Sequence, residues 1–76
     1  MKVEILGSGC PKCLKLEAMV RDAVAKHKLD AEVSHVYDIN KIVEYGVMMT
    51  PALVVDGKVK IAGRLPSESE LLKLIK

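Results

Sequence analysis

Apolar and polar residues follow two different periods along this chain, and each change of period marks the boundary of an element. Residues 3–6 form a short apolar run that is typical of a strand. From Pro11 onward the apolar residues recur every three or four positions, which predicts an amphipathic helix that ends near Leu29 and Asp30. The predicted buried face of this helix carries Cys13, Leu16, Val20, Ala23, Val24 and His27.

The middle of the chain predicts a polar strand followed by a short helix. Residues 31–37 carry more interspersed polar side chains than a central strand tolerates, so we place this strand at an edge of the sheet. Asp38 is suited to cap a helix over residues 39–45, and Gly46 supplies the left-handed residue that ends it. Residues 47–51 then lead into the next strand.

A hairpin and a last helix complete the pattern. Asp56-Gly57 lies between the apolar runs at residues 52–55 and 58–62, and this dipeptide favours a tight turn in which both central residues have positive φ. Ser67 and Glu70 form an S-x-x-E capping box before a final amphipathic helix. The order β-α-β-α-β-β-α predicts an α/β fold, with a four-stranded mixed sheet and helices on both faces.

Composition narrows the class of protein. The 76 residues suffice for one small domain, residues 1–76, and its core must be aliphatic because Tyr37 and Tyr45 are the only aromatic residues. The net charge is +2 and the basic residues are scattered, which disfavours a nucleic-acid-binding surface. No apolar run suits a signal peptide or a membrane span. We therefore expect a cytoplasmic monomer without nucleic-acid or membrane partners.

The candidate chemistry lies in Cys10-Pro11-Lys12-Cys13, which holds the only two cysteines. Pro11 suits a first helical turn, so Cys10 lies where unpaired backbone N–H groups and the helix dipole favour an anion such as a thiolate. The Lys12 charge favours the same thiolate. Cys13 falls on the buried face. A loop this short constrains little of the unfolded chain, which favours redox or metal chemistry over a structural crosslink.

The Cys-x-x-Cys at a helix start, Thr50-Pro51 before a hairpin and the closing helix together resemble the minimal thioredoxin fold. The resemblance covers the whole chain and is greatest to the small thioredoxin- or glutaredoxin-like redox-active disulfide proteins of archaea and bacteria. It implies a thiol–disulfide oxidoreductase in which Cys10 attacks and Cys13 resolves. It further implies no cofactor beyond a Cys10–Cys13 disulfide, protein disulfides as substrates, and a thioredoxin-reductase-like or small-thiol reductant.

The same resemblance assigns supporting roles to four other positions. It makes Pro51 the cis-proline that lies against the disulfide, and it gives Thr50 a backbone contact with an extended substrate. Gly63 matches a glycine that such proteins often carry beside the active site. Glu4 stands six residues before Cys10, where thioredoxins carry a buried acid that helps to deprotonate the resolving thiol. A half-exposed strand carboxylate is the alternative interpretation of Glu4.

Some positions depart from the family pattern. Ser8 and Gly9 stand where thioredoxins carry a tryptophan before the first cysteine. Gly63 is followed by Arg64-Leu65-Pro66 instead of the Gly-Gly and acidic residue that help glutaredoxins to hold glutathione. Lys12 and Arg64 carry the positive charges suited to meet the carboxylates of glutathione.

Two other functions fit part of the pattern. A soft-metal-binding or metal-chaperone module, similar to heavy-metal-associated domains, also carries Cys-x-x-Cys between a first strand and a first helix. Such domains close with a strand, however, and they do not need Thr50-Pro51. A redox sensor whose disulfide changes its affinity for a partner is the third possibility. We assign no role to His27 or His35, and we expect Met48 and Met49 to serve as adaptable packing.

Overall fold

The computed structural model describes residues 1–75, whose strands form one four-stranded sheet in the order β2-β1-β3-β4. β1 is parallel to β2 and antiparallel to β3, and β3 is antiparallel to β4. The element order is the predicted one, and the polar strand β2 does lie at an edge. The elements are β1 (Lys2–Leu6), α1 (Pro11–Lys26), β2 (Glu32–Val36), α2 (Ile39–Glu44), β3 (Ala52–Val55), β4 (Lys58–Ala62) and α3 (Glu68–Ile75).

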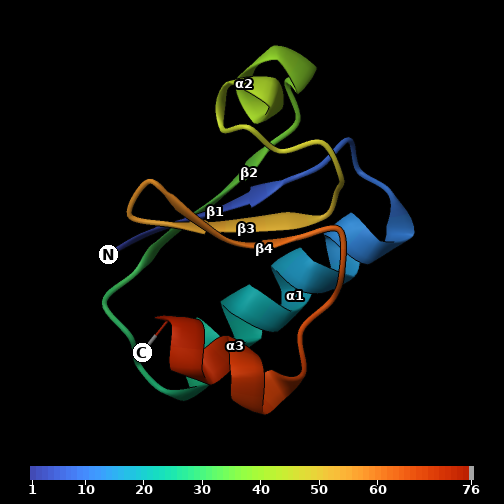
Figure 1. Ribbon diagram of the computed structural model, residues 1–76. Coiled ribbons are helices and arrows are strands. Elements are labelled where there is room, and N and C mark those ends of the chain that lie inside the picture. The colour runs from blue at the N-terminus through green and yellow to red at the C-terminus, as the bar shows by residue number, and fades with distance from the viewer. Residues whose placement is uncertain (76) are drawn as a thin grey trace.

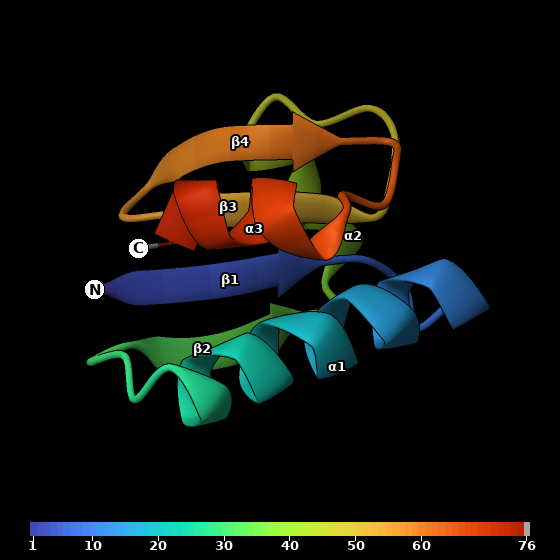
Figure 2. The ribbon, with the colours of Figure 1, turned by 90° about the horizontal axis from the view of Figure 1, so that it is seen from below.

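Helices cover both faces of the sheet, which gives three layers. Figures 1 and 2 show α1 and α3 side by side on one face, with α2 alone on the other. The buried side chains divide in the same way. The larger cluster, under α1 and α3, contains Val3, Ile5, Leu16, Val20, Ala23, Leu53, Val55, Ile61, Leu71 and Ile75. The smaller cluster, under α2, contains Leu6, Ile42, Val47, Ala52 and Val54.

The predicted turn and helix signals are present with the expected geometry. Asp56 and Gly57 have φ of 50° and 83°, as a tight hairpin turn requires. Asp38 accepts a hydrogen bond from the Asn40 backbone N–H at 2.9 Å, which caps α2. Gly46 follows α2 with φ of 78°. These local sequence choices therefore agree with the tertiary fold.

The two longer helices depart from the expectations at their ends. α1 ends at Lys26, three residues early, because Lys28 adopts a left-handed φ of 51° that a helix cannot continue through. Val24 and His27, both expected on the buried face, are only half-buried.

The capping box before α3 is half formed. The Glu70 N–H donates to Ser67 Oγ at 3.2 Å, but the Glu70 carboxylate accepts two hydrogen bonds from Arg64 instead of turning back to Ser67.

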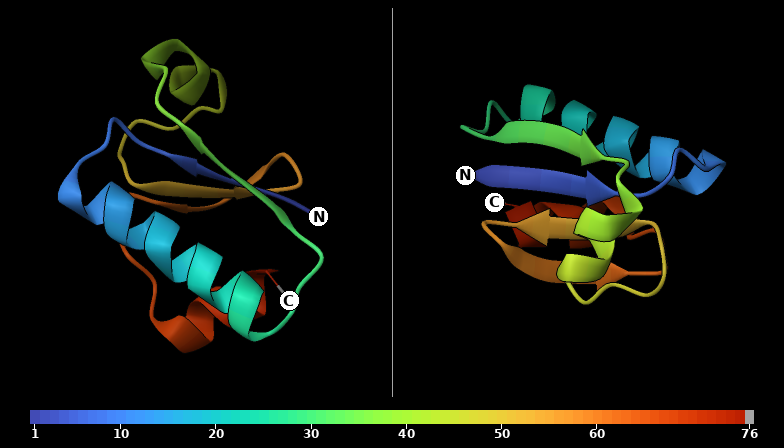
Figure 3. Two further views of the ribbon diagram at one scale, coloured as in Figure 1. Left: turned by 180° about the vertical axis from the view of Figure 1, so that it is seen from behind. Right: turned by 90° about the horizontal axis from the view of Figure 1, so that it is seen from above.

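The strand register brings three distant segments to one edge of the sheet. Leu6 of β1 lies opposite Ala52 of β3, and Ala52 lies opposite Ala62 of β4. The next residues beyond these partners belong to the β1–α1 loop, the loop before β3 and the loop after β4. Figure 3 shows these loops gathered at the same end of the sheet as the start of α1. The candidate site lies at this edge.

Candidate functional site

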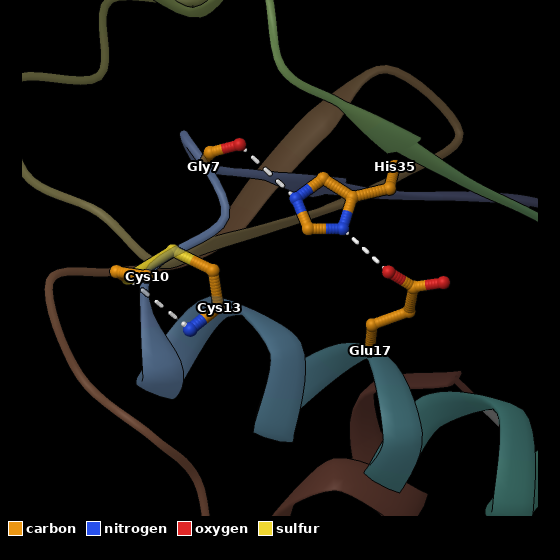
Figure 4. The surroundings of a disulfide bond; sticks show 5 residues. All are labelled: Gly7, Cys10, Cys13, Glu17 and His35. Atoms are coloured by element: carbon orange, nitrogen blue, oxygen red, sulfur yellow. Dashed lines mark hydrogen bonds and ion pairs between the residues drawn. A yellow bond between two sulfur atoms is a disulfide. The ribbon is translucent and has the colours of Figure 1, made fainter.

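The two cysteines form a disulfide at the first turn of α1 (Figure 4), and their Cα atoms are 5.1 Å apart. Cys10 is the N-cap residue, with an extended backbone, and Pro11 is the first helical residue. The Cys10 sulfur accepts a hydrogen bond from the Cys13 backbone N–H at 3.3 Å. Cys10 is partly exposed whereas Cys13 is fully buried. A partner can therefore reach one sulfur and not the other.

The surroundings of Cys10 favour negative charge on its sulfur once the disulfide is reduced. The Cys13 N–H is one of the backbone donors that a helix start leaves unpaired, and the helix dipole adds to its effect. The first turn of α1 contains no acidic residue, and its Lys12 is exposed to solvent. A thiolate in this position is the nucleophile of thiol–disulfide exchange.

Gly7, at the end of β1, allows Cys13 to approach the backbone. A Cβ at this position would overlap Cys13 Sγ and would stand 2.9 Å from Cys13 Cβ. The backbone of Gly7 is thus the surface on which the buried sulfur rests. Gly9 follows with φ of 93°, and a Cβ there would meet the Tyr37 ring at 3.5 Å.

The Thr50-Pro51 segment and Gly63 adjoin each other at the same edge. The Thr50-Pro51 peptide bond is cis, with Pro51 buried and Thr50 exposed. Gly63 has φ of 82°, and its N–H donates to the Pro51 carbonyl at 2.8 Å. A Cβ on Gly63 would lie 3.0 Å from Met49 Cβ, so the glycine makes room for the loop before β3.

Met48 does not provide the packing expected from the sequence, and Met49 provides it only in part. Met48 is 90% exposed and Met49 is 64% exposed. Both precede the Thr50-Pro51 cis bond, and methionine is a flexible apolar side chain. The expectation of packing is therefore wrong for Met48, whereas Met49 lies partly against Gly63.

Glu4 is buried, but it faces the α2 side of the sheet. Its carboxylate accepts a hydrogen bond from the Tyr45 hydroxyl at 2.7 Å, and this bond and burial raise the pKa of Tyr45. The pair borders a cavity of about 570 Å³, together with Asp38, Lys41 and Glu44. Val3 and Ile5, the strand neighbours of Glu4, point to the α1 side instead. The structure therefore brings Glu4 together with Tyr45, on the face opposite the helix that carries Cys13.

His35, to which the sequence assigned no role, lies in the site. Its side chain is only 4% exposed. Nε2 lies 3.0 Å from the Gly7 carbonyl oxygen and Nδ1 lies 2.5 Å from Glu17 Oε1 of α1 (Figure 4). The ring also stacks on Tyr37, with ring centroids 4.0 Å apart and planes 3° from parallel. The strand register is the signal that finds it, because His35 pairs with Ile5 and so shares the α1 face with Gly7.

Glu17 holds the outer side of this histidine. Its Oε2 accepts a hydrogen bond from Arg21 Nε at 2.8 Å, while Oε1 faces His35. The hydrogen bonds to His35 and then to Arg21 hold the pKa of the Glu17 carboxyl below its ordinary value. Glu17 is thus a carboxylate at neutral pH.

Comparison with known proteins gives one family over the whole chain. The family model described as "Thioredoxin domain" matches residues 1–76. The chain is 40% identical over 75 residues to a protein named thioredoxin from Methanothermobacter thermautotrophicus, covering 99% of this chain and 97% of that relative. It is 36% identical over 74 residues to a thioredoxin from Methanocaldococcus jannaschii, covering 97% of this chain and 85% of the relative. The chain belongs to the thioredoxin family.

Family membership and the site geometry agree on the class of chemistry. The four-stranded mixed sheet with three helices is that of a small thioredoxin fold. The thioredoxin relatives and the Cys10–Cys13 pair support a thiol–disulfide oxidoreductase. Within residues 1–75, no helix has both the length and the apolar character needed to cross a membrane.

Proposed function

We propose that this thioredoxin-family protein reduces disulfide bonds in partner proteins and cycles between a dithiol and a Cys10–Cys13 disulfide. The observation that carries the proposal is the unequal placement of the two sulfurs at the start of α1. Cys10 is the partly exposed N-cap whose sulfur accepts a backbone N–H, whereas Cys13 is fully buried behind it. An accessible, stabilised thiolate suits attack, and a protected second thiol suits resolution.

The cycle needs one electron pair and no cofactor beyond the two cysteines. The Cys10 thiolate attacks one sulfur of the partner disulfide, which forms a mixed disulfide and releases the other partner sulfur as a thiolate. Cys13 loses its proton and attacks the Cys10 sulfur, which expels the second partner thiolate. Both partner thiolates take up protons, so the partner gains two electrons and the protein ends as the Cys10–Cys13 disulfide.

The edge that carries the disulfide offers a place for an extended partner segment. Thr50 is exposed beside the cis bond, and its backbone is the proposed contact for the segment flanking the partner disulfide. Pro51 and Gly63 shape the floor of this contact through their 2.8 Å hydrogen bond. Met48 and Met49 supply the adaptable apolar contacts that varied partners require.

The remaining parts of the proposal concern how the protein is used. A thioredoxin-reductase-like enzyme or a small thiol restores the dithiol, and the protein acts as a cytoplasmic monomer. The Arg64 guanidinium already donates two hydrogen bonds to Glu70, which leaves it less able to bind a carboxylate of glutathione. This favours a reductase enzyme over glutathione as the electron donor. A redox titration against glutathione and dithiothreitol, followed by a reductase assay, distinguishes the two donors.

Two matched variants test the cysteine roles. Cys13→Ser is expected to accumulate a mixed disulfide through Cys10 with a disulfide-bonded peptide, detectable by mass spectrometry. Cys10→Ser is expected to form no such adduct and to lose reductase activity, since its remaining thiol is buried. Undiminished exchange in Cys10→Ser contradicts the proposal.

The metal-binding alternative is tested by the same protein under anaerobic conditions. The described chain ends in the helix α3, where a heavy-metal-associated domain would place a strand, and this favours the redox function. Cu(I) is titrated into the reduced protein and into Pro51→Ala. Tight stoichiometric binding by both, without any disulfide turnover, favours the metal module instead.

A further inference from the structure

The His35 ring is hydrogen-bonded at both nitrogens by groups that only accept. The Gly7 carbonyl oxygen has no proton to give, so Nε2, 3.0 Å away, must be the donor. Arg21 Nε donates to Glu17 Oε2 at 2.8 Å, which holds Glu17 as a carboxylate independently of the histidine, so Nδ1 must also donate. A ring that donates from both nitrogens is an imidazolium. With its side chain 4% exposed, this cation is shielded from solvent.

This cation lies beside the buried sulfur. Cys13 Sγ and His35 Nε2 are both within 4 Å of the point where a Cβ of Gly7 would stand. Figure 4 shows the ring above the disulfide, with the Gly7 carbonyl at one nitrogen and Glu17 at the far one. The nitrogen that faces Gly7 is thus on the sulfur side, and the compensating carboxylate is on the other side of the ring.

We propose that His35 is a positioning residue of the disulfide site: it fixes the Gly7 turn on which Cys13 rests, and its positive charge, on the Cys13 side of the pair, stabilises the single thiolate of the reduced Cys10–Cys13 pair. The proposal deepens the proposed function and rests on it. The groups that face the ring are Cys13 and Glu17 from α1, Arg21 behind Glu17, and the stacked Tyr37. β1 faces it with Ile5 and the Gly7 carbonyl.

The electron and proton count gives the proposal a distinct pH signature. Reduction by a dithiol such as dithiothreitol adds two electrons and breaks the S–S bond, while the dithiol becomes a disulfide. At low pH the reduced form takes up two protons and contains no thiolate, so a nearby cation does not stabilise it. Between the pKa values of the two thiols it takes up one proton, and one sulfur remains a thiolate. His35 then favours the reduced form.

His35→Gln removes the charge, and His27→Gln is the matched control because His27 lies at the opposite end of α1. In a pH titration of reduced His35→Gln, the thiolate absorbance is expected to rise at a pH about one unit higher than in wild type. The equilibrium with dithiothreitol is expected to move toward the disulfide, up to about tenfold above the thiol pKa, and to converge with wild type at low pH. His27→Gln is expected to match wild type throughout.

Nitrogen NMR of the wild-type ring tests the proposal even if His35→Gln does not fold. Both ring nitrogens are expected to be protonated at pH 7. A neutral ring at pH 7 overturns the proposal.

Two further outcomes separate this proposal from the function beneath it. A His35→Gln protein that is less stable but has an unchanged thiolate titration and an unchanged equilibrium overturns the proposal and leaves the proposed function standing. A wild-type protein that forms no reversible disulfide with dithiothreitol overturns the proposed function itself.

Discussion

Each face of the sheet carries a hydrogen-bonded carboxylate, buried at Glu4 and partly exposed at Glu17, but only Glu17 belongs to the disulfide site. On the α2 face, Glu4 accepts the Tyr45 hydroxyl at the border of an open cavity. On the α1 face, Glu17 binds His35, which binds the Gly7 backbone that Cys13 touches. Glu4 stands six residues before Cys10 and Glu17 seven residues after it, but only Glu17 is connected to the disulfide, through His35 and the Gly7 backbone.

Strand alternation explains the difference. Successive side chains of a strand point to opposite faces, so Val3, Ile5 and the position of Gly7 share the α1 face. Glu4 is one residue out of phase with them and points toward α2. An acid six residues before the first cysteine therefore does not by itself lie beside the resolving thiol. On the α1 face, the polar side chains near Cys13 are instead His35 of β2 and Glu17 of α1.

The largest expected effect concerns core packing under α1, and an exposed residue of α2 serves as its control. Leu16 is fully buried in the larger cluster under α1, so Leu16→Ala is expected to lower the free energy of unfolding by about 3 kcal/mol. Val43, on α2, is 56% exposed, and Val43→Ala is expected to cost less than about 0.5 kcal/mol. Urea denaturation of both oxidised proteins measures this. Equal losses would mean that α2 packs more tightly than the structure indicates.

The next effect concerns the approach of Cys13 to Gly7. Gly7→Ala places a methyl group in the position of Cys13 Sγ, so it is expected to cost about 2 kcal/mol and to weaken disulfide formation. The exposed neighbour Ser8 provides the control, and Ser8→Ala is expected to change neither quantity. Urea denaturation and mass spectrometry of the disulfide fraction give the two readouts. A Gly7→Ala protein as stable as Ser8→Ala would show that the backbone shifts without cost.

A smaller effect tests the α2 face directly. Tyr45→Phe removes the hydrogen bond to Glu4 and is expected to cost about 1 kcal/mol, and Glu4→Gln is expected to cost a similar amount. Neither variant is expected to move the thiolate titration of the reduced protein, because Glu4 lies across the sheet from α1. A shift in Glu4→Gln as large as that in His35→Gln would restore Glu4 as the acid that serves Cys13.

Much of the fold follows from local sequence signals that need no tertiary information. The strand and helix order, the turn at Asp56-Gly57 and the caps at Asp38 and Gly46 are each set by a few adjacent residues. The placement of Cys10 at the helix start and of Cys13 on the buried face also follows from spacing. The prediction from sequence is wrong where a side chain has a second hydrogen-bond partner available. The Glu70 carboxylate, for example, binds Arg64 instead of completing the capping box.

The site was only partly predictable because its second half depends on the register between strands. His35 looks like a polar residue of an edge strand until the parallel pairing with Ile5 is known. A one-residue change in that register would turn His35 to the α2 face and separate it from Glu17. The sequence alone does not set this register, so the histidine whose ring lies against the Gly7 backbone received no role.

The smallest effect concerns acid sensitivity and compares two carboxylates that both bind an arginine. The pKa values of Glu17 and Glu70 are both lowered in the folded protein, by His35 and Arg21 in one case and by Arg64 in the other. Their stabilisation is therefore complete above the ordinary glutamate pKa and is lost as the pH falls below about 4.

Glu17 should contribute more than Glu70 to the free energy of unfolding, and its contribution should be less sensitive to salt. The reason is that the histidine partner of Glu17 is buried, whereas the Arg64–Glu70 pair is exposed. Urea denaturation between pH 6 and pH 3, roughly across that window, is expected to give a flatter stability curve for Glu17→Gln than for Glu70→Gln. The Glu70→Gln curve is expected to approach wild type in high salt. If Glu70→Gln flattens the curve as much as Glu17→Gln, the buried histidine adds nothing to the carboxylate beside it.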